Sequence, residues 1–375
     1  MVVPSPLGWE PIPSRPRSAW RWFVGVVALL VAAVIGLHNI VVPYYALLPG
    51  EATAVNGPGG LMTVKKAHPG GGQLFLTTVA LENRVTVWDR LFSFAHPDVA
   101  LVKKIDLTGG ASPAQFAQQS AQEMTDAELF AKVAAFRRLG YKVAEHGDGA
   151  LVLGVDANGP NAAKFMAGDV IKKLDGKQVS LAADAIASIR THKVGDTVKV
   201  ETVRPGSQPT TLDFTVTTNA CGVTNCPNSP NRPIVGLALG SDQDHFDLPA
   251  QVGLTIDAGP IGGPSAGLAF SLGVIDALTS HRLTGGHKVA VTGTIDPTGA
   301  VGPVGGVAQK TIAVEHAGIE YFLVPPDEYP DATARAKGHH LTVVKVNTLD
   351  DAINFLRSIG GDTTGIPAAS PLAPS

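Results

Sequence analysis

The apolar positions along this chain fall into three successive patterns. Residues 20–43 are almost wholly apolar, which predicts one helix long enough to span the roughly 30 Å hydrocarbon core of a bilayer. Over 44–219, short apolar runs between turns predict strands, and a longer helical pattern covers 112–139. Over 232–358, strand-like and helix-like segments alternate, as is typical of an α/β domain. We expect the ends, 1–19 and 361–375, to be disordered tails.

The charges beside the apolar segment predict its orientation. Arg15, Arg17 and Arg21 lie at its start. The first charge after it is Glu51. Because basic residues gather at the cytoplasmic end of membrane spans, we expect a cytoplasmic N-terminus and an exported body. A cleaved signal peptide is the alternative, but residues 36–40 match a small-residue cleavage site poorly, so the sequence favours an uncleaved anchor.

The exported part begins with a segment of mixed character, residues 44–138. Strands are predicted at 74–81 and 83–88, and a long helix over 112–139. Gly140 is suited to end that helix. We therefore expect an α+β segment here, separate from the regions that follow.

Residues 139–219 predict a small β-rich domain in which short strands surround one helix, 182–191. Turn signals occur at 168–169 (Gly-Asp) and 175–176 (Asp-Gly). With the apolar strand at 149–153, this pattern resembles a PDZ domain of the bacterial protease type. The resemblance implies a module that adds an extended peptide to a sheet edge. A β-rich spacer that binds no ligand is the alternative.

The last region predicts three helices among strands. One helix is expected over 265–279, between strands at 252–257 and 289–295. A second helix is expected over 307–316, and Thr348 is placed to cap the third.

Composition narrows the functional classes. Only 16% of the 375 residues are charged and the net charge is −3, which argues against binding nucleic acid through basic charge. No Gly-x4-Gly-Lys-Ser/Thr sequence occurs, so we expect no ATP binding. Histidines and cysteines lack the spacing of metal ligands, and we expect neither a metal nor another cofactor. In an exported body Cys221 and Cys226 would form a local disulfide; two free thiols are the alternative.

The segment 262–267, Gly-Gly-Pro-Ser-Ala-Gly, is the first candidate for chemistry. Because it joins a predicted strand to a predicted helix, Ser265 would lie beside N–H groups that have no intrahelical acceptor. Such donors can stabilise an oxyanion. An ordinary N-cap serine is the alternative. The Gly-x-Ser-x-Gly spacing also leaves open an α/β-hydrolase-type esterase, with His339 or His340 as the late histidine.

Lys310 is the second candidate. It shares one face of its predicted helix with Val307 and Val314, so it should point toward the interior. Burial disfavours the ammonium, lowers the pKa of the lysine and favours its neutral form. A neutral lysine can take the proton of a serine hydroxyl in a Ser-Lys dyad. A lysine that extends to solvent from the edge of this face is the alternative.

The two motifs, with Thr292 and a glycine-rich turn between them, resemble the proteolytic domain of Lon proteases over 232–358. With the anchor and the PDZ-like domain, the chain resembles the PDZ-containing Lon-like serine proteases of bacteria (YlbL-type family). The resemblance implies that Ser265 is the nucleophile, that Lys310 is the general base and that Thr292 orients Lys310. It also implies that the nucleophile turn and oxyanion region comprise Gly263, Pro264, Ala266 and Gly267.

Two positions depart from the Lon pattern. ATP-dependent Lon enzymes carry acidic residues where Gly262 and Thr294 stand, so Lon's substrate pocket and activation switch are not carried over to this chain. Lon-type domains often assemble into rings, and the resemblance leaves homo-oligomerisation open.

The sequence therefore predicts a multi-domain protein: a transmembrane helix, a β-rich PDZ-like domain and an α/β Lon-type proteolytic domain. The resemblance implies a single-pass protein of the bacterial plasma membrane, with its catalytic body outside the cytoplasm. The predicted function is an ATP-independent serine endopeptidase that hydrolyses peptide bonds of exported or membrane-associated proteins. Its expected partners are protein or peptide substrates and the lipid bilayer. The alternative is a catalytically inactive, membrane-tethered PDZ scaffold that binds peptides.

Overall fold

The computed structural model describes residues 17–57, 60–64, 73–93, 98–157, 159–206, 208–220, 232–242, 245–249, 253–279 and 282–368. Cys221, Cys226 and residues 1–16 and 369–375 of the predicted tails lie outside these ranges. Residues 361–368, expected to be disordered, lie within them, and Ile366 packs into the core. The chain divides into two compact units. We call residues 1–139 with 252–375 the discontinuous unit, and residues 140–251 the inserted unit.

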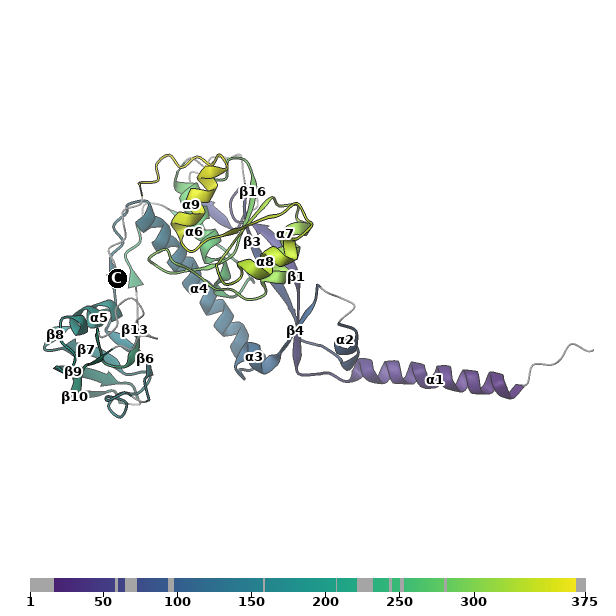
Figure 1. The fold of residues 1–375 in the computed structure, drawn as a ribbon, viewed down its shortest axis with the longest axis horizontal. Helices are drawn as coiled ribbons and strands as arrows, with labels where there is room; N and C mark the ends of the chain where they lie inside the picture. Colours follow the sequence, from purple (N-terminus) through teal and green to yellow (C-terminus); the bar gives the residue numbers. More distant parts are fainter. Residues whose placement is uncertain are drawn as a thin grey trace, which may run out of the picture. The chain divides into compact units, whose positions relative to one another are not determined.

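One mixed sheet organises the discontinuous unit, in the order β20-β19-β16-β3-β1-β4. Its strands are β1 (Tyr44–Ala54), β3 (Gln73–Glu82), β4 (Ala100–Lys103), β16 (Lys288–Val291), β19 (Tyr321–Val324) and β20 (Thr342–Lys345). The N-terminal strands pair antiparallel and the C-terminal strands pair parallel. The parallel β3–β16 pair joins the two halves. The segment 44–138, which the sequence analysis treats as separate, therefore builds half of the sheet that carries the α/β region (Figure 1).

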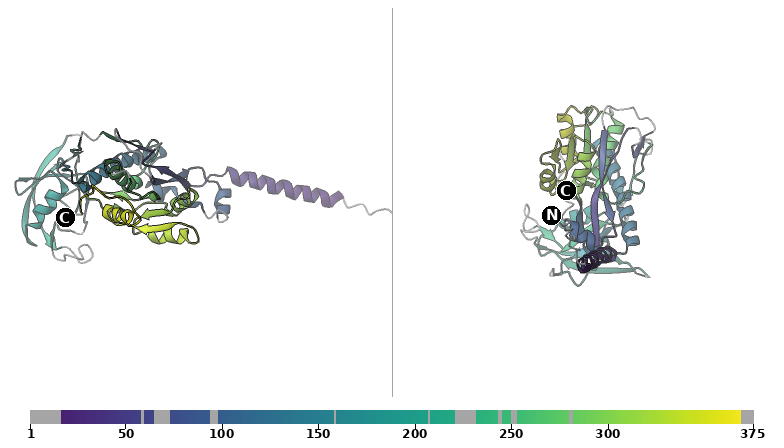
Figure 2. Two further views of the ribbon diagram at one scale, coloured as in Figure 1. Left: turned by 90° about the horizontal axis from the view of Figure 1, so that it is seen from above. Right: turned by 90° about the vertical axis from the view of Figure 1, so that its right-hand side faces the viewer.

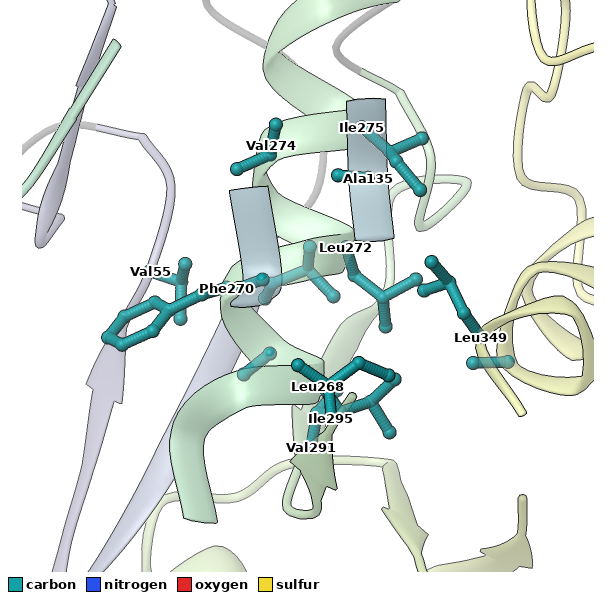
Figure 3. Close-up of a cluster of buried hydrophobic side chains, with 14 of the residues drawn as sticks. Val55, Ala135, Leu268, Phe270, Leu272, Val274, Ile275, Val291, Ile295 and Leu349 are labelled. Atoms are coloured by element: carbon teal, nitrogen blue, oxygen red, sulfur yellow. The ribbon is translucent and has the colours of Figure 1, made fainter. Parts of the chain in front are cut away.

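Helices pack on both faces of this sheet. Alternation along β16 sends Val289 and Val291 into one buried cluster and Ala290 into another. The first cluster takes side chains from α4 (Pro113–Arg138), α6 (Gly267–Leu278) and α9 (Leu349–Ser358). The second takes side chains from α7 (Val307–His316) and α8 (Tyr329–Ala336). Figure 3 shows the first cluster, where Val55 of the N-terminal half lies beside Phe270 of α6.

Local signals account for the helix boundaries. The predicted long helix is α4, and its N-cap Ser112 accepts a hydrogen bond from the N–H of Gln115. Thr348 caps α9 in the same way. The predicted strand over 83–88 is wrong: Thr86 and Asp89 form a capping box that starts helix α2 (Val87–Phe92).

Short elements complete the discontinuous unit: α3 (Lys104–Thr108), β2 (Met62–Val64) paired with β15 (Leu254–Ile256), and β17 (Thr294–Ile295) paired with β18 (Val301–Gly302). Near the N-terminus, helix α1 (Arg17–Asn39) contains a stretch, Trp20–Asn39, whose length and mean hydropathy of 2.1 suffice to cross a membrane. None of that stretch is buried. Both views of Figure 2 show purple-to-blue N-terminal strands beside the green and yellow C-terminal elements.

The inserted unit is a β-rich domain built on the sheet β10-β9-β7-β6-β13. Its elements are β5 (Glu145–His146), β6 (Ala150–Val155), β7 (Val170–Leu174), β8 (Lys177–Gln178), α5 (Ala182–Arg190), β9 (Thr197–Arg204), β10 (Thr210–Thr217), β11 (Asn219–Ala220), β12 (Pro233–Ile234), β13 (Leu237–Ser241) and β14 (His245–Phe246). Edge strand β13 pairs with β6, so this unit continues beyond residue 219, where the sequence analysis ends the PDZ-like domain.

Candidate active site

A hydrogen bond and a close backbone contact hold the backbone around Ser265 in place. Ser265 lies in a 3₁₀ turn, Pro264–Ala266, that leads into α6. Its carbonyl accepts a hydrogen bond of 2.9 Å from the N–H of Gly293. A Cβ at Gly267 would lie 3.0 Å from the backbone nitrogen of Ile295, so no larger residue fits there without a shift. Gly263 has φ +88, a conformation that favours glycine. The glycines of this motif thus hold the serine turn against the loop after β16.

Lys310 and Ser265 come from helices on opposite faces of the sheet and meet beyond the carboxyl end of β16. The Lys310 Nζ lies 2.8 Å from Ser265 Oγ and 3.0 Å from Thr292 Oγ1. Thr292 is fully buried, and its hydroxyl also lies 3.4 Å from the Ser265 carbonyl oxygen. The three side chains that the sequence analysis singles out are therefore in one hydrogen-bonded group.

Burial sets the protonation of Lys310. The side chain is only 3% exposed, and this desolvation lowers its pKa from 10.5 to about 8. The charge of Glu328 opposes the shift. One oxygen of that carboxylate accepts the N–H of Val304 at 3.0 Å. A substantial fraction of Lys310 is consequently neutral slightly above neutral pH, with a lone pair available to a hydroxyl proton.

A cleft of about 580 Å³ lies beside Ser265 and Lys310. One wall is the nucleophile turn, with Gly263, Pro264 and Ala266. Most of the other lining residues come from β3 and α4, more than 130 positions earlier in the chain: Leu76, Thr77, Thr78, Val79, Leu81, Phe116, Gln119, Ser120, Glu123 and Met124. The cleft is thus built from both halves of the discontinuous unit.

Two of these early residues touch the site in ways that the sequence analysis missed. The Ser120 carbonyl accepts a hydrogen bond of 2.8 Å from the N–H of Gly263, so α4 holds the nucleophile turn. The Thr77 hydroxyl is buried in the wall of the cleft and has no hydrogen-bond partner among the described residues. Neither lies in a recognisable motif. The β3–β16 pairing brings Thr77 to the site, and the packing of α4 against α6 brings Ser120.

The esterase alternative has no support in this geometry. Of the described residues that line the cleft, none is a histidine. His339 is exposed and lies 3.6 Å from Glu315.

Two family models match successive parts of the chain. Residues 138–217 match the PDZ domain model, and residues 238–357 match the model of the Lon protease (S16) C-terminal proteolytic domain. These matches confirm the predicted fold class, in which an N-terminal apolar helix precedes a PDZ domain and an α/β Lon-type domain with a mixed sheet.

Several curated relatives are Lon proteases. The chain is 36% identical to the Lon protease of Campylobacter concisus over 98 residues, 25% of this chain and 12% of that protein. It is 33% identical to Lon protease 2 of Thermus thermophilus over 129 residues, 33% of this chain and 16% of that protein. The chain thus spans a small part of these relatives. A solved PDZ domain of an SdrC-like protein from Listeria monocytogenes is 29% identical, with a TM-score of 0.21, and the match covers 24% of this chain and 87% of that one.

Proposed function

We propose that this chain, which joins a PDZ domain to a Lon (S16) C-terminal proteolytic domain, is a membrane-anchored serine endopeptidase with a Ser265–Lys310 dyad. The observation that carries the proposal is the buried Lys310 Nζ at 2.8 Å from Ser265 Oγ. Among the described residues, no carboxylate lies within salt-bridge distance of this nitrogen. A lysine buried beside two hydroxyls, without a paired charge, is suited to act as a base.

The chemistry proceeds by acyl transfer. Neutral Lys310 takes the proton of Ser265 as Oγ attacks the peptide carbonyl carbon. We assign stabilisation of the oxyanion to the N–H groups of Ser265 and Ala266, in the 3₁₀ turn, because the first N–H groups of a helical turn have no acceptor within it. The ammonium of Lys310 then returns a proton to the leaving amine as the C–N bond breaks. Water, deprotonated by the same lysine, hydrolyses the acyl-enzyme. Thr292 keeps the lysine oriented through its 3.0 Å contact.

An extended polypeptide fits the cleft best. β16 pairs with β3 only as far as Leu76, and the cleft lining continues along β3 at Thr77, Thr78 and Val79. Backbone groups on that side of β3 are therefore open to an added strand. Because the sequence holds no phosphate-loop motif, we propose that cleavage does not use ATP bound by this chain.

The apolar helix α1 and the PDZ domain would position the substrate. We propose that α1 anchors the protein with its N-terminus in the cytoplasm and the cleft outside, since Arg15, Arg17 and Arg21 precede or open the apolar stretch. The PDZ domain would bind an extended peptide at its edge strand β13, which α5 flanks through a 3.0 Å hydrogen bond from the N–H of Ala182 to Ser241 Oγ.

A covalent inhibitor tests the proposal directly. The full chain in detergent should cleave an unfolded protein without ATP, and a peptide boronate should stop the cleavage by forming an adduct. Native mass spectrometry should show the adduct on the wild type and not on Ser265→Ala, because the hydroxyl of Ser265 is the activated nucleophile. If the protein cleaves nothing and takes up no boronate, the inactive scaffold is the better interpretation.

The pH profile is a second expected outcome. The value of kcat/KM should rise as Lys310 loses its proton, with a midpoint near its pKa of about 8. Glu328→Gln should move this midpoint to lower pH, because the carboxylate stabilises the ammonium. Initial rates from about pH 6 to about pH 10 would show both effects. A rate that falls with pH over this range, or a midpoint indifferent to Glu328→Gln, would contradict the role of Lys310.

A further inference from the structure

The segment that leaves α1 is hydrogen-bonded to two short helices. The N–H of Val87, at the start of α2, donates to the carbonyl of Ile40 at 2.9 Å. The N–H of Lys104, at the start of α3, donates to the carbonyl of Pro43 at 3.0 Å. The N–H of Val42 donates to the carbonyl of Val85 at 2.8 Å. Both helices are therefore held within a few residues of the end of the apolar stretch.

Large apolar side chains surround this junction without cover. Leu91 of α2 is 52% exposed, and Ile105 of α3 is 60% exposed. Ile40 and Val41 are also more than half exposed. Exposed large apolar side chains on neighbouring segments are typical of a surface that meets a membrane or another protein. We call these four residues the junction surface.

The charges near the junction surface almost cancel. The cations are Arg84, Arg90, Lys103 and Lys104, and the acids are Glu82, Asp89 and Asp106. Arg90 lies over the ring of Tyr44 at 4.4 Å, and Lys104 lies over the ring of Tyr45 at 5.1 Å. Tyr45 is buried, but Tyr44 is partly exposed, and an aromatic ring with a cationic neighbour at the end of a membrane span is characteristic of the headgroup layer of a bilayer.

The length of the apolar helix sets the depth of the junction surface in the bilayer. The 20 residues of Trp20–Asn39 rise about 30 Å, which matches the hydrocarbon core. The junction surface begins at the next residue, Ile40, so it falls at the headgroup level of the leaflet through which α1 leaves. We propose that the junction surface rests in this lipid interface. The inference depends on the proposed anchoring by α1.

The position of the junction surface at the membrane also determines which way the cleft runs. Leu81, which lines the cleft, pairs across the sheet with Leu47, three residues beyond Tyr44. That separation is about 10 Å along a strand. Leu107 of α3 lines the cleft too. The cleft therefore extends from Ser265 toward the interface, where it would receive segments of membrane-associated chains close to the bilayer.

Quenching by lipid tests the junction surface. Single cysteines would replace Leu91 or Ile105 in the full chain, with Cys221 and Cys226 changed to serine, and carry a bimane label. In phosphatidylcholine vesicles, lipids brominated near the headgroup should quench both labels several-fold more than a label at His340. His340 is exposed and lies just before β20. Because β20, β19, β16 and β3 run parallel, His340 lies at the end of the sheet where β3 begins. Glu82 and its partner on β1 lie at the opposite end. Because the net charge is small, neutral lipid should suffice.

A label at Leu30, in the middle of α1, separates the two ways of failing. If Leu30 is quenched by deep bromines while labels at 91 and 105 match the control at 340, the anchor holds and the junction surface is wrong. If Leu30 is not quenched, the anchor itself fails and the junction surface with it. Unchanged thermal unfolding of each labelled protein would show that the substitutions leave the fold intact.

Discussion

Lys310→Met should abolish peptide cleavage and leave the protein at least as stable as the wild type. Methionine has nearly the volume of the lysine side chain but no basic nitrogen, so Ser265 Oγ loses its base. Loss of one member of a catalytic group of this kind lowers kcat on the order of 10³-fold or more. Initial rates on an unfolded substrate would measure the loss.

The stability of this variant separates a catalytic lysine from a structural one. The folded state lowers the pKa of Lys310 from 10.5 to about 8, so the fold disfavours the ammonium. The free-energy cost of holding the Lys310 ammonium in the folded protein is fully present below about pH 8 and disappears as pH rises toward 10.5. Below that window it is on the order of 3 kcal/mol. Methionine removes the free-energy cost of burying an ammonium. The loss of hydrogen bonds to two hydroxyls cancels about 1–3 kcal/mol of this gain. The melting temperature near neutral pH should therefore not fall.

Two further variants complete this test. Ser265→Ala should lose as much activity as Lys310→Met, and the double variant should be no worse, because the two residues act as one unit. Lys345→Met, at an exposed lysine of β20, should keep wild-type activity. A Lys310→Met protein that keeps about a tenth of the wild-type rate, when loss of a base predicts far less, would show that this lysine is not the general base.

The candidate pair could be predicted from sequence because its signals are local. Glycines around Ser265 and the helical spacing around Lys310 each describe a short stretch of chain. Their meeting, at 2.8 Å, follows from a helix on each face of the parallel half of the mixed sheet. The boundaries of α4 and α9 were equally predictable, since Ser112 and Thr348 supply caps within three residues of their partners.

The remainder of the site depends on long-range pairing, which leaves no local pattern. Thr77 and Ser120 belong to an N-terminal segment that looks complete by itself, with its own strands and helix. What joins it to the α/β region, across an inserted domain, is the β3–β16 pairing together with the packing of α4 against α6. Edge strand β13 was missed for the same reason, because its partner β6 lies more than 80 residues earlier. At 83–88, a capping box overrode an apolar pattern that suggested a strand.

Leu74→Ala should destabilise the discontinuous unit by about 2–5 kcal/mol, the usual cost of removing a buried leucine. Leu74 of β3 is fully buried in the cluster that also contains Phe270 of α6 and Val289 of β16. If residues 44–138 were a separate domain, the change would leave α6 and the Ser265 turn untouched. Because they share one core, amide protection in 268–278 should fall by the same free energy, as hydrogen exchange resolved by peptide would show.

A matched substitution in the inserted unit serves as the control for Leu74→Ala. Ile171 of β7 is 1% exposed in the separate core of that unit, so Ile171→Ala should lower protection in β9 and spare α6. Leu74→Ala should also shift the loss of peptidase activity on heating to lower temperature, because Leu74 shares a core with α6, which follows the Ser265 turn. Ile171→Ala should not, because Ile171 lies in the other core. Equal protection of α6 in Leu74→Ala and wild type would contradict a shared core and make residues 44–138 a domain of their own.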